Sequence, residues 1–86
     1  MAATDLVSLP EIGAVTAREL VDVGIADAVA LREVGAREAF LRIRDQLDPG
    51  VCFHLFSALE CGVRGVRSTQ LTDDERAQLR AQFEVL

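Results

Sequence analysis

The sequence contains no lysine, tyrosine or tryptophan, one histidine, two cysteines and two prolines. Because its aromatic residues are limited to four phenylalanines, aliphatic side chains must fill most of the core, and half of the 86 residues are hydrophobic. Alanine and leucine, which favour helices, are prominent among them. A chain of this length forms one domain, and this composition predicts a helical core that needs neither a metal nor a disulfide.

Long apolar runs and targeting signals are also missing. The most apolar stretch, residues 51–63, is interrupted by His54 and Glu60 and is shorter than a membrane span, and the first residues lack the features of a secretory leader. If Cys52 and Cys61 share one helix, they lie on opposite faces and roughly 13 Å apart along its axis, which is beyond disulfide reach. We therefore expect a cytoplasmic protein with free thiols and no membrane partner.

Residues suited to catalysis or metal binding are scarce. His54 has no nucleophile or acid at a spacing that predicts a shared site, and we expect it to be a half-buried structural residue. One histidine and two cysteines on opposite faces of a helix do not supply the four ligands of a zinc site. The acidic pairs Asp73-Asp74 and Glu11/Glu19 are typical of a helix start and of solvated surface. We predict a chain that is not an enzyme and binds no cofactor or metal.

The net charge of −5 is unevenly distributed. Residues 1–31 carry five acids and one arginine (−4), residues 32–67 carry six arginines and five acids (+1), and residues 68–86 carry four acids and two arginines (−2). An acidic chain repels phosphate at long range, so a nucleic-acid surface would have to lie in the middle third. Apart from one histidine, every basic residue is an arginine. This bias is typical of a GC-rich genome, and the alternative is selection of arginine for bidentate contacts with phosphate or carboxylate.

Glycine, proline and capping residues divide the chain at regular intervals and predict an all-α bundle of about five short helices. The expected helices lie close to residues 14–23, 27–34, 37–46, 49–66 and 73–86. Residues 1–5 are expected to be a flexible N-terminus and residues 6–86 a single domain. No segment predicts a strand.

The helix ends follow from local chemistry. Gly24, followed by a hydrophobic residue, is typical of a left-handed C-terminal stop, and Gly35 is expected to end the next helix in the same way. Asp27 is placed to cap that helix. The pair Asp48-Pro49 combines a capping carboxylate with a proline at the first helical position, and it predicts a helix start there.

The later helices also show which faces are buried. In the third, Phe40, Leu41 and Ile43 are expected to face inward. In the fourth, apolar residues recur at helical spacing: Cys52, Leu55, Phe56, Leu59 and Val63. The last helix opens with a capping box from Thr72 to Glu75.

Ala58, Gly62 and Gly65 form a strip of small residues on the fourth expected helix. Each glycine within a helix costs about 1 kcal/mol relative to alanine, so the strip predicts close approach of another backbone. Two interpretations stand equally. The strip packs against the protein's own C-terminal helix, or it contacts a partner, a second copy of the chain included.

A turn precedes the first of these helices, at Leu9, Pro10, Ile12 and Gly13. It resembles the hairpin of helix-hairpin-helix modules, in which backbone N–H groups at a helix start meet a phosphate. Glu11 stands where such hairpins have the first of two glycines, and its carboxylate would oppose a phosphate. We therefore favour a packing turn over a phosphate clamp.

Several short motifs recur in a fixed order. They are Leu9-Pro10-x-Ile12-Gly13, Gly24-Ile25, Gly35 with residues 38–42, residues 48–52, Ala58-Leu59-Glu60 and Gly65-Val66-Arg67. In order and spacing they resemble the C-terminal domain of TfoX/Sxy-type proteins, bacterial regulators of natural competence for DNA uptake, over roughly residues 6–84. The resemblance implies a helical, helix-hairpin-helix-like domain. The N-terminal domain of those regulators is missing from this sequence, so the alternatives to competence are service in another pathway and origin as one domain cut from a longer protein.

The leading hypothesis is a non-enzymatic regulatory domain whose partner is another protein. The alternative is a DNA-binding helix-hairpin-helix-like module that acts through the hairpin and an arginine surface. That surface comprises Arg37, Arg42, Arg44, Arg64 and Arg67. Interleaved acids (Glu33, Glu38, Asp45 and Glu60) favour a solvated, salt-bridged face over a nucleic-acid footprint. Formation of a homodimer is left open.

Overall fold

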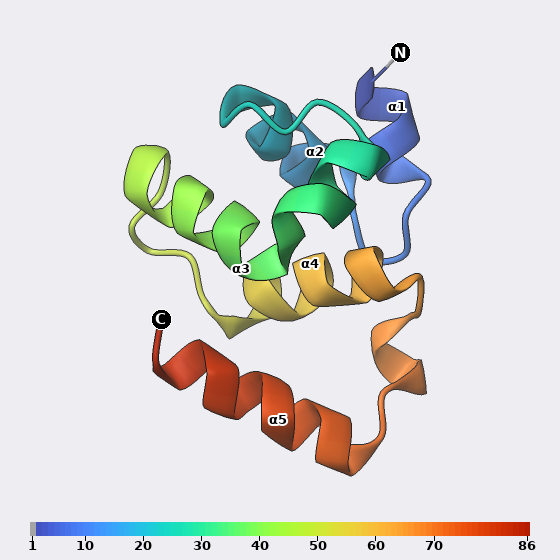
Figure 1. The fold of residues 1–86 in the computed structure, drawn as a ribbon, viewed down its shortest axis with the longest axis vertical. Coiled ribbons are helices and arrows are strands. Elements are labelled where there is room, and N and C mark those ends of the chain that lie inside the picture. Colours follow the sequence, from blue (N-terminus) through green and yellow to red (C-terminus); the bar gives the residue numbers. More distant parts are fainter. Residues whose placement is uncertain (1) are drawn as a thin grey trace.

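The structure, a computed structural model, describes the backbone of residues 2–86 and the side chains from Asp5 onward. Its elements are α1 (Ala2–Val7), α2 (Ala14–Asp22), α3 (Ala28–Gln46), α4 (Phe53–Arg64), the short 3₁₀ helix η1 (Ser68–Gln70) and α5 (Asp73–Glu84). Figure 1 shows α1 and α2 at one end of the long axis, α5 at the other, and α4 between α3 and α5. Residues 2–86 contain no strand, which confirms the expected all-α bundle of five helices.

The first helix differs from the expectation for the N-terminus. Residues 1–5 were expected to be flexible, but α1 begins at Ala2 (residue 1 lies outside the described chain). Leu6 is fully buried, and the Ala28 backbone N–H donates to Asp5 Oδ2 at 3.0 Å. α1 thus supplies both a core residue and a hydrogen-bond acceptor at the start of α3.

The second and third expected helices are two parts of α3, divided at Gly35. This glycine has φ 83° and ψ 162°, which interrupts the helix and turns the chain. Asp27 caps the first part as predicted, because its Oδ1 accepts from the Ala30 N–H at 2.8 Å. The division at Gly35 is confirmed, although its extended ψ differs from the left-handed stop that was expected.

Two other predicted helix ends are confirmed by their hydrogen bonds. At the end of α2, the Ile25 N–H donates to Leu20 O at 2.8 Å and the Gly24 N–H to Val21 O at 3.0 Å, the pattern of a Schellman stop. At the start of α5, Thr72 Oγ1 accepts from the Glu75 N–H at 3.1 Å. Glu75 Oε1 in turn accepts from the Thr72 N–H at 2.8 Å, which completes the capping box.

The predicted start of α4 at Asp48-Pro49 is wrong. Asp48 Oδ1 accepts from the Gly50 N–H at 2.9 Å and closes a local turn, and the helix begins at Phe53. Cys52 is the N-cap, makes no side-chain capping bond and is exposed, so it lies outside the apolar stripe in which it was expected. A carboxylate followed by proline serves a turn as well as a helix start.

The core joins all five helices. Its largest fully buried side chains are Leu6, Leu20, Ile25, Leu31, Phe40, Ile43, Phe56, Leu59, Cys61 and Leu79. Leu41, expected inward, is half-buried. Burial raises the pKa of the Cys61 thiol, with a smaller contribution from the Glu11 charge. No helix within residues 2–86 has the length and apolar character needed to cross a bilayer.

Candidate functional site

The predicted hairpin, residues 9–13, is a tight turn between α1 and α2. Leu9 and Ile12 are buried, and the Ile12 N–H donates to Leu9 O at 3.3 Å. Gly13 is exposed and is the N-cap of α2, where no side chain accepts a hydrogen bond from the first turn. The apolar side of the hairpin therefore packs inward, and its polar backbone side faces solvent.

Glu11 adopts φ +66° and is the one non-glycine residue with positive φ in the described chain. For an L-residue this left-handed conformation costs roughly 1–2 kcal/mol. Its Oε2 accepts from the Ser68 N–H at 3.0 Å, so the carboxylate ties the hairpin to the first turn of η1. The sequence marks Glu11 as a substitute for glycine but not its bond to Ser68, which is formed across the fold.

The strip of small residues is used at one position for packing on the hairpin. A Cβ at Gly62 would lie 2.9 Å from Ile12 Cγ1 and 3.4 Å from Pro10 O. Gly65 instead ends α4 in a left-handed conformation with φ 73°, and Ala58 is half-buried. At Gly62 the close approach is thus made by the hairpin and not by α5.

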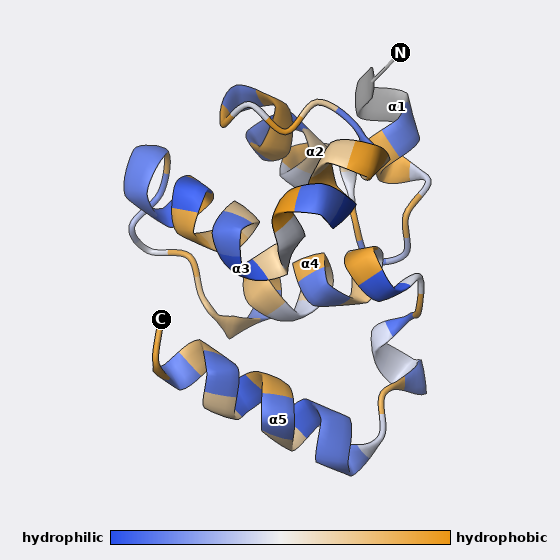
Figure 2. Cartoon of the chain, in the orientation of Figure 1, coloured by the Kyte–Doolittle hydropathy of each residue, from blue (hydrophilic) through white to orange (hydrophobic). Residues whose placement is uncertain are grey.

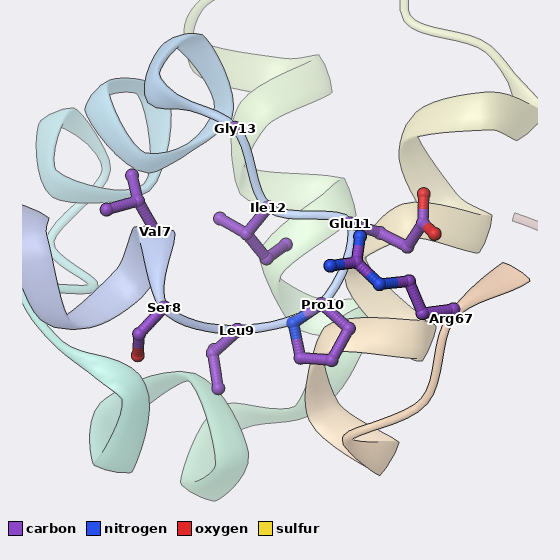
Figure 3. A pocket seen from close by; sticks show the side chains of 8 residues that line it. All are labelled: Val7, Ser8, Leu9, Pro10, Glu11, Ile12, Gly13 and Arg67. Carbon is purple, nitrogen blue, oxygen red and sulfur yellow. The ribbon is translucent and has the colours of Figure 1, made fainter.

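Beside the hairpin lies an open groove of about 390 Å³, which we call the hairpin groove. Its lining residues are Val7, Ser8, Leu9, Pro10, Glu11, Ile12, Gly13 and Arg67. Figure 3 shows the Arg67 side chain reaching from the segment after α4 toward the turn at Pro10 and Glu11. Val7, which lines the groove, is 41% exposed, and Val15, two residues after the groove-lining Gly13, is 74% exposed. The groove thus combines polar walls, one arginine and one exposed valine.

Arg42 and Arg44, two of the five candidate surface arginines, are half-buried and bonded within the chain. Arg42 Nε lies 2.9 Å from Glu38 Oε2, and Arg44 Nε lies 3.0 Å from Asp45 Oδ1. Arg44 Nη1 also donates to Leu86 O at 2.9 Å. These contacts leave both guanidinium groups less free to bind a ligand.

The other three candidates differ in their pairing. Arg64 Nε lies 3.3 Å from Glu60 Oε1, and its Nη1 lies 3.7 Å from Glu75 Oε2. Arg37 and Arg67 are exposed and form no ion pair within residues 5–86. Arg64 and Arg67 lie at and just after the C-terminal end of α4. Figure 1 shows this end of α4 at the opposite end of the α3–α4 pair from the C-terminal end of α3, to which Arg42 and Arg44 belong. The five arginines therefore do not gather on one patch.

His54 is exposed, so the expectation of a half-buried histidine is wrong. Cys52, two residues before His54, is also exposed, whereas Cys61 is buried within α4. Within the described residues, no three histidine, cysteine or acidic side chains come together as metal ligands would.

The arrangement is that of an all-helical domain with a helix-hairpin-helix-like turn, held from behind by α4 and bordered in front by an open groove. The sequence profile of the TfoX C-terminal domain matches residues 2–83. The chain belongs to this family, which confirms the resemblance drawn from the motifs.

Two solved structures of Listeria monocytogenes proteins are similar to this chain over nearly their whole length. One, described as an uncharacterized protein in a triclinic crystal form, is 38% identical, with a TM-score of 0.85 and coverage of 93% of this chain and 90% of that one. The other, a protein of unknown function in a tetragonal form, is 35% identical, with a TM-score of 0.82 and 96% coverage of both chains. A search of curated proteins gave no match.

Proposed function

We propose that this chain is a non-enzymatic regulatory domain that binds another protein through the hairpin groove. The observation that carries the proposal is the exposure of Val7 in a groove that is also lined by Arg67, an arginine with no ion-pair partner in the described chain. Exposed aliphatic side chains bordering a polar groove, with an arginine beside them, match the composition of protein contact sites. Arg67 would give such a contact a charged anchor.

The charge of the groove favours a protein over a phosphate. Glu11 places a carboxylate in the groove wall, and the whole chain has a net charge of −5. Both repel a polyanion, while a protein surface can present a single carboxylate to Arg67 and an apolar side chain to Val7. Membership in the TfoX C-terminal family supports a regulatory role, and the family resemblance points to natural competence in the bacterial cytoplasm.

The test uses two matched valines. Val15 and Val29 each occupy the second position of a helix, α2 and α3, and are 74% and 59% exposed. Val15→Asp and Val29→Asp therefore add the same charge at the same position of a helix. The two helix starts differ in that the carboxylates of Asp27 and Asp5 already accept from the first turn of α3. A tagged chain should recover a stoichiometric protein partner from lysate of the source bacterium, Val29→Asp should retain it, and Val15→Asp should lose it. Recovery of no partner, or equal recovery by both variants, would contradict the proposal.

A second candidate function, binding of duplex DNA, is favoured by one observation. The first turn of α2 has no side-chain cap and no acidic residue, and it follows the groove that Arg67 lines. Free N–H groups at a helix start attract a phosphate. Titration with duplex DNA at about 50 and 200 mM salt should then show a steep loss of affinity, and Arg67→Ala should lower the salt slope by about one. Equal slopes would remove Arg67 from the DNA contact.

A further inference from the structure

The C-terminal helix is attached to the molecule by a narrow contact. Among the elements of the described chain, the backbone of α5 lies beside α4 alone, and its side chains also reach Phe40 of α3 and the Ser68 carbonyl of η1. Leu79 is the one buried residue of α5, and Phe83 is half-buried. Figure 2 shows α5 as mostly hydrophilic along its length. An isolated helix of 12 residues is marginal in water, so α5 depends on this contact for its stability.

The face beneath α5 is aromatic. Phe83 of α5 lies among three other rings, with centroid distances of 5.7 Å to Phe40, 5.6 Å to Phe53 and 6.3 Å to Phe56. The Arg80 guanidinium lies over the Phe53 ring, 4.1 Å from its centroid. Departure of α5 would expose these rings, so the face requires a helix to cover it.

Charges at the border of this face match the charges of α5. Arg64 on α4 lies 3.7 Å from Glu75, in the acidic first turn of α5. At the other end of the helix, Arg44 donates to the Leu86 carbonyl at 2.9 Å. The face is therefore complementary to an amphipathic helix that begins with acids, and α5 itself has this sequence.

The connection before α5 is extended at its end. Leu71 has φ −72° and ψ 136°, and Thr72 has φ −75° and ψ 165°, which any residue adopts without strain. Its attachments are the half-buried Val66 side chain, the buried Leu71 side chain and the bond from the Ser68 N–H to Glu11 Oε2. Fully extended, residues 65–72 would span roughly 27 Å, compared with a shortest molecular dimension of 20 Å. The connection is therefore long enough to carry α5 to a neighbouring molecule.

We propose that two copies of this chain exchange α5, each helix docking on the aromatic face of the other copy. The contacts of α5 itself are the same as those within one chain, so exchange sacrifices only contacts of the extended connection, namely η1, the buried Leu71 side chain and the bond from Ser68 to Glu11. Its extent depends on protein concentration. The proposal concerns the side of α4 that carries α5 and does not rest on protein binding at the hairpin groove.

Two full-length variants test the exchange by complementation. Leu79→Asp disables the helix and keeps the aromatic face intact. Phe53→Asp disables the face at a half-buried residue, at the first position of α4, where an acid suits the helix. In an equimolar mixture, α5 of the Phe53→Asp chain should dock on the Leu79→Asp chain. Native mass spectrometry should then show a 1:1 complex at least tenfold more abundant than the dimer of either variant alone.

The control replaces Ala81, which is exposed on the same helix, by aspartate. The Ala81→Asp chain keeps its own α5 docked, so its mixture with Phe53→Asp should give at least tenfold less complex. If the Leu79→Asp and Phe53→Asp chains stay as separate monomers when mixed, the exchange is overturned. The aromatic face would then be a site for a helix of another protein.

Hydrogen–deuterium exchange of Leu79→Asp gives an independent reading. Protection should be lost in residues 73–84 and retained in α2 and α3, because α5 opens as a separate unit. Loss of protection throughout the chain would show that α5 belongs to the cooperative core, and it would also overturn the proposal.

Discussion

Glu11 combines a strained backbone with a bond across the fold, and substitution can separate the two effects. Glu11→Ala removes the carboxylate that accepts from the Ser68 N–H, but it keeps a side chain at φ +66°. Glu11→Gly removes the same bond and also relieves the left-handed strain. Glu11→Gln keeps an acceptor and removes only the charge. The three variants therefore form a series from which each contribution follows by difference.

The structure sets the size of each effect. Loss of a half-exposed hydrogen bond of this kind costs about 1 kcal/mol, so Glu11→Ala should lower the free energy of unfolding by that amount. Glycine recovers roughly 1–2 kcal/mol of strain but loses about 0.5–1 kcal/mol through the greater freedom of the unfolded chain. Glu11→Gly should thus be more stable than Glu11→Ala by about 0.5–1 kcal/mol.

The assay is urea unfolding followed by helical circular dichroism, since the chain has no tryptophan or tyrosine to report by fluorescence. In a domain of this size, 1 kcal/mol corresponds to a change of roughly 4–8 °C in Tm. From most to least stable, the order should be wild type, Glu11→Gln and Glu11→Ala. Glu11→Gly should also be more stable than Glu11→Ala. A Glu11→Ala chain as stable as wild type, or more stable than Glu11→Gly, would refute the account of the hairpin.

Three further predictions concern packing, capping and pH. Gly62→Ala should destabilise the fold by about 1 kcal/mol, because the clash with Ile12 of the hairpin outweighs the gain in helix propensity. A variant as stable as wild type in urea would show that the hairpin shifts to accommodate the added methyl group. Asp5→Ala should cost about 1 kcal/mol of stability, because it removes the acceptor of the Ala28 N–H at the start of α3. Asp22→Ala loses only an exposed ion pair and should cost less than about 0.5 kcal/mol. Equal unfolding midpoints for the two variants would contradict this. Burial raises the pKa of the Cys61 thiol above its ordinary value of 9.0, so the folded state holds this proton more tightly and the free energy of unfolding should fall as pH rises above that value. Cys61→Ala should flatten this decline. An unchanged pH profile of stability would exclude the thiol as its cause.

Local chemistry was sufficient to predict much of the fold. Gly24 and Asp27 end and start helices through bonds within a few residues, and the box at Thr72 is equally local. The start of α4 was missed because the Asp48 carboxylate accepts from an N–H two residues ahead, in a turn that uses the same residues as a helix cap. α1 was missed because its anchor, Asp5, bonds to Ala28, far along the chain.

The candidate site shows the same division. The hairpin was found from its residues, and Glu11 was recognised as the residue in place of a glycine. Its partner Ser68 lies 57 positions away, and Gly62 meets Ile12 across the core, so neither contact has a local signal. The arginines were grouped by sequence position, whereas ion pairing and the antiparallel course of α3 and α4 separate them.

The most direct test of protein binding at the hairpin groove is site-specific photo-crosslinking in the source organism. A photoreactive residue at position 15 should give one protein adduct, and the same residue at position 29 should give none. Adducts with nucleic acid at position 15, or identical adducts at both positions, would contradict the groove as a protein-binding site.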